Sequence, residues 1–137
     1  DLKDISKYAF VPNYAYRMMR HLVPGAYTFI LQATKLVPKI MLTNQKSIGI
    51  RVPDNPISLA LVRELEHPII TTSVTGPDES LYNHPEEIDQ LYGKTLDLVI
   101  DGGSIVAEHS SIIDLTGDEP VVVRKGKGDL SFISEEK

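Results

Sequence analysis

The sequence predicts an α/β fold in which a twisted, mixed β-sheet carries helices on its faces. Amphipathic stretches with helical spacing alternate along the chain with short runs that are rich in β-branched and aromatic residues. Proline and glycine turns separate these stretches. The last two apolar runs are joined by the turn Thr116–Glu119, which predicts a β-hairpin and therefore an antiparallel part of the sheet.

The first half of the chain is predicted to form two helices and two strands. Helical spacing indicates helices from Leu2 to Phe10 and from Tyr14 to Leu22, separated by a break at Pro12. A Pro-Gly turn then leads into a strand from Tyr27 to Ala33, and the next strand runs from Ser47 to Val52. In the first strand Tyr27, Phe29 and Leu31 share one face, and Thr28, Ile30 and Gln32 share the other.

The second half is predicted to contain two more helices and four strands. One helix begins at Pro56 after the cap Asn55, and another runs from Pro85 to Gly93. The buried stripe of the helix at Pro56 is predicted to be Ile57, Ala60, Leu61 and Leu65. The strands are predicted at Pro68–Thr72, Leu96–Ile100, Ser111–Leu115 and Pro120–Arg124.

The composition indicates one ordinary globular domain. With 137 residues, 42% hydrophobic and 24% charged, we expect a single domain over residues 1–129 and an acidic tail over residues 130–137. The absence of cysteine excludes disulfides and thiolate metal sites and fits a reducing cytoplasm. No apolar run reaches membrane-spanning length. The net charge of −5 counts against broad nucleic-acid binding but leaves a local basic groove open.

Two polar side chains stand where apolar ones would serve a core better. Thr28 follows the Pro24-Gly25 turn, and it is either a strand residue chosen for β propensity or a donor to a phosphate or sugar oxygen. Arg51 ends an apolar strand, where it either pairs with Asp54 or holds a phosphate or carboxylate with its planar fork. Together they are suited to an anionic ligand such as a nucleotide phosphate.

Other polar candidates lie at strand ends and in one loop. Ser73 is either a turn residue or a site residue, and Ser110 is either a polar residue at the start of a strand or a site residue. Asp114, inside an apolar strand, is read as a hydrogen-bonded structural carboxylate rather than a site residue. The loop that begins at Arg124 is either a phosphate cradle or a solvated exit from the hairpin. The histidines have no metal-ligand spacing, so no metal site is predicted from side chains.

The segments Pro24–Leu31 and Ser47–Pro56, in this order and spacing, resemble the signature of the Sua5/YrdC/YciO proteins. The resemblance covers about Asp1 to Asp129. The Tyr-Ala-Tyr-Arg-Met-Met helix before Pro24 and the replaced motif after Ser73 are most similar to the YciO branch. Characterised members of this family make threonylcarbamoyl-adenylate from L-threonine, bicarbonate and ATP, for the modification of tRNA.

The resemblance implies the same fold, a twisted mixed sheet with helices, and a set of site residues. Thr28, Arg51, Ser73 and Arg124 are then expected at the nucleotide, and Ser110 at the L-threonine. ATP is the implied substrate, with Mg²⁺ as the ion that such a reaction uses. Double-stranded RNA or tRNA is a further partner that the family implies, as is a role as a translation factor.

Two departures from the family pattern change the expected activity. Thr75 stands where the family's Ser-x-Asn motif has asparagine, and a hydroxyl cannot offer an amide's paired donor and acceptor. The family's Pro-Thr-Asp/Glu-Thr strand and Lys-x-Arg loop are not in this sequence, so we expect an N-terminal part of the fold to be absent. We therefore expect that these residues alone do not run the synthase reaction efficiently.

Three functions remain open from the sequence. The first is a cytoplasmic nucleotide- or RNA-binding protein of the YciO type, with ATP, AMP, L-threonine and RNA as partners. The second is an active threonylcarbamoyl-AMP synthase when the full-length chain is considered. The third is a purely structural fragment. The departure at Thr75 favours the first over the second, and the complete Pro-Gly-x-x-Thr and Gly-x-Arg-x-Pro matches favour a retained ligand site over the third.

Overall fold

The structure is a computed structural model that describes residues 2–133. The chain divides into two compact units, and each is described by itself. Unit 1 consists of Asp1–Asn55 and Ser110–Lys137, and unit 2 consists of Pro56–His109.

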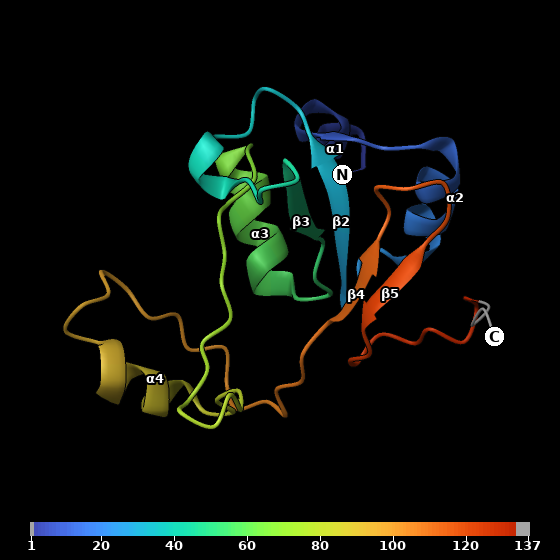
Figure 1. Cartoon of the computed structure of the whole chain (residues 1–137). Helices are drawn as coiled ribbons and strands as arrows, with labels where there is room; N and C mark the ends of the chain where they lie inside the picture. Colours follow the sequence, from blue (N-terminus) through green and yellow to red (C-terminus); the bar gives the residue numbers. More distant parts are fainter. Residues whose placement is uncertain (1, 134–137) are drawn as a thin grey trace. The chain divides into compact units, whose positions relative to one another are not determined.

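Unit 1 contains the β-sheet and the two N-terminal helices (Figure 1). Its elements in chain order are α1 (Leu2–Tyr8), β1 (Ala9–Phe10), α2 (Asn13–Leu22), β2 (Tyr27–Ala33), the short 3₁₀ helix η1 (Lys39–Met41), β3 (Ser47–Arg51), β4 (Ser111–Asp114) and β5 (Val121–Arg124).

The sheet is mixed, as the sequence predicts. Strand β2 lies at its centre, antiparallel to β1 and β3 and parallel to β4. Strands β4 and β5 pair antiparallel, which confirms the predicted hairpin. The parallel pairing brings together the segments that begin at Tyr27 and at Ser111, so residues far apart in the chain meet at one end of the sheet.

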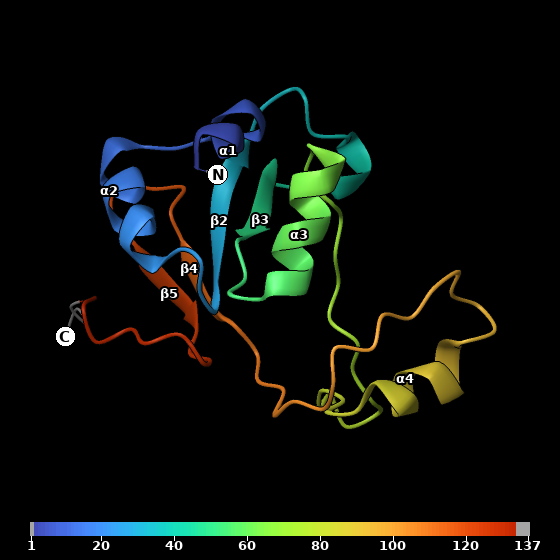
Figure 2. The ribbon, with the colours of Figure 1, turned by 180° about the vertical axis from the view of Figure 1, so that it is seen from behind.

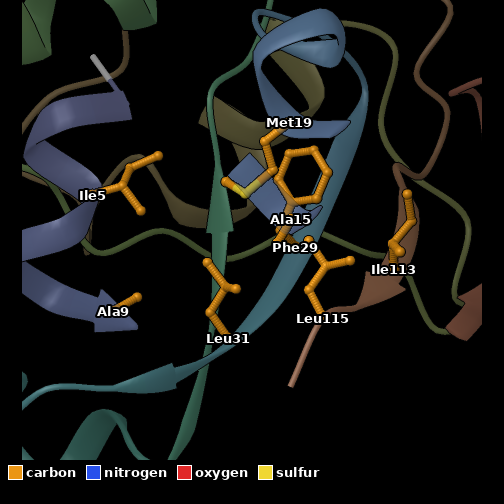
Figure 3. Close-up of a cluster of buried hydrophobic side chains, with 8 residues drawn as sticks. All are labelled: Ile5, Ala9, Ala15, Met19, Phe29, Leu31, Ile113 and Leu115. Carbon is orange, nitrogen blue, oxygen red and sulfur yellow. The ribbon is translucent and has the colours of Figure 1, made fainter. Parts of the chain in front are cut away.

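The hydrophobic core lies between one face of this sheet and the helices α1 and α2 (Figures 1 and 2). Phe29 and Leu31 of β2 are fully buried, which confirms the predicted inward face of that strand. Met19 of α2 and Ile113 of β4 are buried in the same cluster (Figure 3). Burial of one such side chain stabilises the fold by about 1.5–3 kcal/mol, so this face is anchored firmly.

The first helix is shorter than predicted. It ends at Tyr8, because Ala9 and Phe10 leave it to form β1 and pair with Ala33 and Gln32. The prediction extended the helix to Phe10 because Ala9 has helical spacing from Ile5. Ala9 is nevertheless buried in the same core as Ile5, since the strand carries its side chain to the same cluster.

The predicted acidic tail begins with residues that pack against the hydrophobic core. Leu130 and Ile133 are partly buried against the hydrophobic cluster, and the amide of Ile133 donates to the carbonyl of Leu130 at 3.0 Å. The predicted acidic tail thus begins with packed residues. Its last part, residues 134–137, lies outside the described residues.

Unit 2 consists of two helices and long connecting segments. The helices are α3 (Pro56–Leu65) and α4 (Pro85–Tyr92), and both begin with proline as predicted. The predicted strands at Pro68–Thr72 and Leu96–Ile100 are wrong, because neither segment has a strand partner among residues 2–133. An apolar run becomes a strand only where a second backbone satisfies its hydrogen bonds.

The predicted buried stripe of α3 is also wrong. None of Ile57, Ala60, Leu61 and Leu65 is buried. The spacing of the stripe is helical, but spacing alone does not supply the surface that would cover it. Among the described residues, none of the helices is long and apolar enough to cross a lipid bilayer.

Candidate functional site on the second face of the sheet

The sheet register places three candidate residues on one line. Thr28 of β2 pairs with Arg51 of β3 on one side and with Ile112 of β4 on the other, and Ile112 pairs with Arg124 of β5. Directly paired residues project to the same side of a sheet, and neighbours along a strand project to opposite sides. The side chains of Arg51 and Thr28 therefore lie on the face opposite Phe29, which we call the second face. The β4–β5 register shifts between Ile112 and Ile113, so Arg124 is placed on this face by its guanidinium, whose Nη2 lies 3.4 Å from the Oγ of Ser110.

Thr28 is hydrogen-bonded to a serine from the other end of the sequence. Its Oγ1 lies 2.7 Å from the Oγ of Ser110, the residue directly before β4. Ser110 is only 5% exposed, and Thr28 is partly buried. The sequence treats these two residues as separate candidates, and the parallel pairing of β2 with β4 brings them into contact.

Arg124 is hydrogen-bonded to the same serine. Its Nε and Nη2 donate to the carbonyl oxygen of Ser110 at 3.1 and 2.9 Å, and Nη2 lies 3.4 Å from the Ser110 Oγ. The guanidinium fork thus fixes the peptide that carries the hydroxyl. Its Nη1 group takes part in none of these three bonds.

The Thr28–Ser110 pair has one hydrogen to offer a ligand. Each hydroxyl carries a single O–H, and only one of the two donates in the bond between them. Whichever residue donates, the O–H of the other is not used in that bond. Because Arg124 can only donate, it cannot accept this hydrogen. The pair can therefore donate to an oxygen of an anion placed above it.

Arg51 is exposed and makes no ion pair with Asp54 among the described residues. Within the described residues, the structure therefore does not contain the Arg51–Asp54 pair that is one of the two alternatives for Arg51. Beside it Gly49 keeps space open on the second face, since a Cβ at this position would lie 3.2 Å from the Cγ2 of Thr28. With a strand spacing of about 4.8 Å, Arg51 and Arg124 are separated by about 14 Å of sheet, with the hydroxyl pair between them.

The loop that follows β5 is fixed to the sheet by a buried serine. The Oγ of Ser111, which is fully buried, donates to the carbonyl of Gly128 at 2.6 Å and accepts from the amide of Gly126 at 3.0 Å. The hydroxyl of Tyr27 donates to the carbonyl of Asp129 at 2.8 Å. The cationic loop Arg124–Gly128 is therefore an ordered part of the sheet end.

Two glycines permit the close contacts at this end of the sheet. A Cβ on Gly128 would lie 2.5 Å from the Tyr27 ring and 2.7 Å from the carbonyl of Ala26. A Cβ on Gly25 would collide with the carbonyl of Leu22. Contacts this short are not tolerated, so the Pro-Gly turn and the loop glycine are required by packing.

Asp114 has a structural role, as predicted. Its Oδ1 accepts from the amide and the hydroxyl of Thr116 at 2.9 and 2.6 Å. The nearby Tyr14 hydroxyl donates to the carbonyls of Leu115 and Gly117 at 3.1 and 2.7 Å. Burial, followed by the negative charges of Asp114 and Asp118, raises the pKa of Tyr14. This cluster holds α2 against the end of β4.

Ser73 and Thr75 belong to unit 2, whereas the residues of the second face belong to unit 1. Thr75 forms an isolated bridge with Leu81. The assignment of Ser73 to the nucleotide stays a sequence prediction. Among residues 2–133 there is no group of three histidine, aspartate or glutamate side chains that could hold a metal ion.

Sequence reasoning did not single out Ser111, Gly49 or Tyr27 as parts of the site. Ser111 looks like the ordinary first residue of a strand, and its bonds to the loop depend on where β5 returns. The signal that was present is the pair of glycines at positions 126 and 128, because glycines flanking a lysine indicate a backbone that approaches another segment closely.

The fold and this face define an α/β domain with cations and hydroxyls arranged for an anion at one end of a mixed sheet. A family model described as Sua5_yciO_yrdC, Telomere recombination, matches residues 1–126. The chain therefore belongs to the Sua5/YciO/YrdC family. The resemblance seen in the two signature segments is thereby confirmed.

The relatives include one of the YciO branch and two threonylcarbamoyl-AMP synthases. The protein YciO of Escherichia coli is 47% identical over 132 residues, and its crystal structure superimposes with a TM-score of 0.91 over 96% of this chain. The putative threonylcarbamoyl-AMP synthase of Methanocaldococcus jannaschii is 34% identical over 92% of this chain and 59% of its own length. The threonylcarbamoyl-AMP synthase of Pyrococcus abyssi is 31% identical over 91% of this chain and 37% of its own length.

A structure of P. abyssi Sua5 complexed with L-threonine superimposes with a TM-score of 0.82 and 26% identity, over 92% of this chain and 38% of that one. The chain spans 64% of the length of E. coli YciO in sequence and 65% of it in the crystal structure. These likenesses confirm the predicted fold and the closeness to YciO.

Proposed function

We propose that this chain is the sheet-bearing part of a nucleotide-binding protein, with the phosphates of ATP or AMP on the second face. The observation that carries the proposal is the line formed by Arg51, Thr28 and Arg124 across four strands. In it two cations flank a hydroxyl pair that has one hydrogen to donate. Hydrogen bonds from cations and hydroxyls to an anion are among the stronger ones in proteins.

The site lies at the amino ends of the parallel strands β2 and β4. Thr28 is the second residue of β2, and Ser110 directly precedes β4. Ligands in open parallel sheets usually bind at the carboxyl ends, where helix N-termini add positive charge. Here the side chains of Arg51 and Arg124 supply that charge from the carboxyl ends of the antiparallel strands β3 and β5.

The test of this proposal is a calorimetric titration of the full-length protein with ATP and with AMP. Arg51→Ala is expected to weaken ATP binding about 10- to 150-fold, since a hydrogen bond to a charged group contributes about 1.5–3 kcal/mol. Arg17→Ala is the matched control, because Arg17 is an exposed arginine of α2 and α2 packs on the other face of the sheet. Equal ATP affinity in wild type and Arg51→Ala would refute the proposal.

RNA is the second partner that the sequence leaves open. The net charge of −5 favours a small anion over an extended phosphate backbone. Duplex RNA is therefore expected to bind more weakly than ATP and to lose affinity steeply as salt rises. Tight RNA binding that survives moderate salt, with no ATP binding, would replace the nucleotide proposal by an RNA-binding one.

A threonylcarbamoyl-AMP synthase is the second candidate function for the full-length protein. The likeness to P. abyssi Sua5 in complex with L-threonine favours it. Thr75, in place of an amide side chain, counts against it. We expect nucleotide binding without steady pyrophosphate release. Steady release that requires ATP, bicarbonate and L-threonine together would establish the synthase instead.

A further inference from the structure

We infer that Ser111 is a positioning residue, which fixes the cationic loop Arg124–Gly128 so that the site prefers the polyphosphate end of a nucleotide. The inference rests on the proposed nucleotide-binding function of the second face. It assigns different roles to two adjacent serines. Ser110 offers its hydroxyl to the second face, whereas Ser111 serves the loop.

The hydroxyl of Ser111 is fully used inside the protein. Its hydrogen is donated to the carbonyl of Gly128 at 2.6 Å, and its oxygen accepts from the amide of Gly126 at 3.0 Å. The side chain is fully buried. Because Ser111 precedes Ile112 and follows Ser110, its side chain projects to the core side, away from the second face. Ser111 therefore has neither the position nor a spare hydrogen to touch a ligand there.

The same two bonds determine how the chain leaves β5. Arg124 is the last residue of β5, and Gly126 lies two residues further on. The pairing of Arg124 with Ile112 fixes the backbone at the end of β5. The bond from the Gly126 amide to the Ser111 hydroxyl fixes the backbone two residues later. Without the hydroxyl, the carbonyl of the buried Gly128 would lose its partner, and a buried group without a partner is costly. The amide of the exposed Gly126 would lose its bond to β4.

Rigid placement of this loop matters for polyphosphate more than for the nucleoside. The loop begins with the cation Arg124, whose guanidinium lies beside the Ser110 hydroxyl of the second face. A flexible cation loses side-chain and backbone entropy when it binds, and a cation already held in place does not. The loss of Ser111 should therefore reduce the affinity for charged groups selectively.

The experiment compares the affinities of adenosine, ATP and inorganic triphosphate for the full-length protein. Ser111→Ala is expected to weaken ATP and triphosphate binding about tenfold, the scale of one lost hydrogen bond, and to leave adenosine binding unchanged. Ser111→Thr keeps the hydroxyl and is expected to restore ATP binding. The matched control is Ser47→Ala. Ser47 is also a buried serine with a hydroxyl bond, of 2.8 Å to Thr43, but it lies at the opposite end of the sheet.

The outcomes separate the inference from the proposed function. Wild-type protein that binds neither ATP nor triphosphate refutes the function itself. Wild-type protein that binds both, with Ser111→Ala unchanged or with adenosine weakened to the same extent, refutes the positioning role alone. An equal loss of ATP affinity in Ser47→Ala also refutes it, because general destabilisation would then explain the effect. If Ser111→Ala does not fold, Ser111→Cys replaces it, since sulfur is a weak hydrogen-bonding group of similar size.

Discussion

The Thr28 and Ser110 hydroxyl oxygens lie 2.7 Å apart although 82 positions separate the two residues in the chain. The contact exists because β2 and β4 are parallel neighbours, with Thr28 paired to Ile112. The antiparallel pairing of β2 with β3 sets Arg51 beside Thr28, and the antiparallel pairing of β4 with β5 sets Arg124 beside Ile112. Under the proposed function, a variant that disturbs this polar cluster should change both the stability of the fold and the affinity for an anion.

Removal of both hydroxyls should cost less than the sum of the single removals. Thr28→Val and Ser110→Ala are each expected to lower the free energy of unfolding by about 1 kcal/mol, because each leaves the other hydroxyl without its partner. In the double variant that partner is also absent, so a coupling of about 0.5–1.5 kcal/mol is expected. Urea unfolding of the four proteins measures it. Strictly additive effects would show that the bond contributes nothing.

Replacement of Arg124 tests the fork on the Ser110 carbonyl. Arg124→Ala should lower the free energy of unfolding by about 1.5–3 kcal/mol, the typical contribution of a hydrogen bond to a charged group. Arg124→Lys should recover only part of this, since a lysine cannot donate two parallel bonds to one oxygen. Arg17→Ala serves as control, with an expected change within about 0.5 kcal/mol because the residue is exposed. Full recovery in Arg124→Lys would contradict the fork.

The close contact at Gly128 predicts a destabilising methyl group. Gly128→Ala should cost about 1–3 kcal/mol, because its Cβ would press on the Tyr27 ring and the Ala26 carbonyl. Gly117→Ala is a matched control, since a Cβ there meets nothing within 4 Å. Thermal or urea unfolding of both variants decides the point. Equal stability of the two variants would show that the loop can move away from β2 freely.

Alkaline pH should weaken the fold through Tyr14. Burial and the charges of Asp114 and Asp118 raise the pKa of this tyrosine in the folded protein. Its contribution to stability is present below the unfolded pKa of about 10 and is lost as the pH rises through the raised folded value. Urea unfolding between pH 9 and 11 should therefore show a smaller fall for Tyr14→Phe than for wild type. Parallel curves would contradict this linkage.

Sequence patterns predicted most of unit 1 because local features, such as residue alternation and turn residues, identify its strands. The alternation in Tyr27–Ala33 identified both the strand and its inward face, and the turn Thr116–Glu119 identified the hairpin. The patterns failed where the outcome depends on a partner. Ala9 and Phe10 left the helix because Gln32 and Ala33 offered them a strand to pair with.

In unit 2 a predicted strand is missing because it has no partner strand. The apolar run Leu96–Ile100 has strand composition but no second strand beside it among the described residues, so it is a connecting segment without regular secondary structure. The candidate site shows the same division. Thr28, Arg51 and Arg124 stand out as polar residues in apolar strands, whereas the role of Ser111 depends on a loop that returns 15 to 17 residues later in the chain.

The most direct test of the second face as a phosphate site is a nitrogen-15 NMR titration of the full-length protein with ATP. The largest signal changes are expected at the side-chain Nε of Arg51 and Arg124 and at the backbone amides of Thr28 and Ser110. The Nε signal of Arg17 is expected not to shift. ATP binding with changes elsewhere and none at these groups would contradict the account.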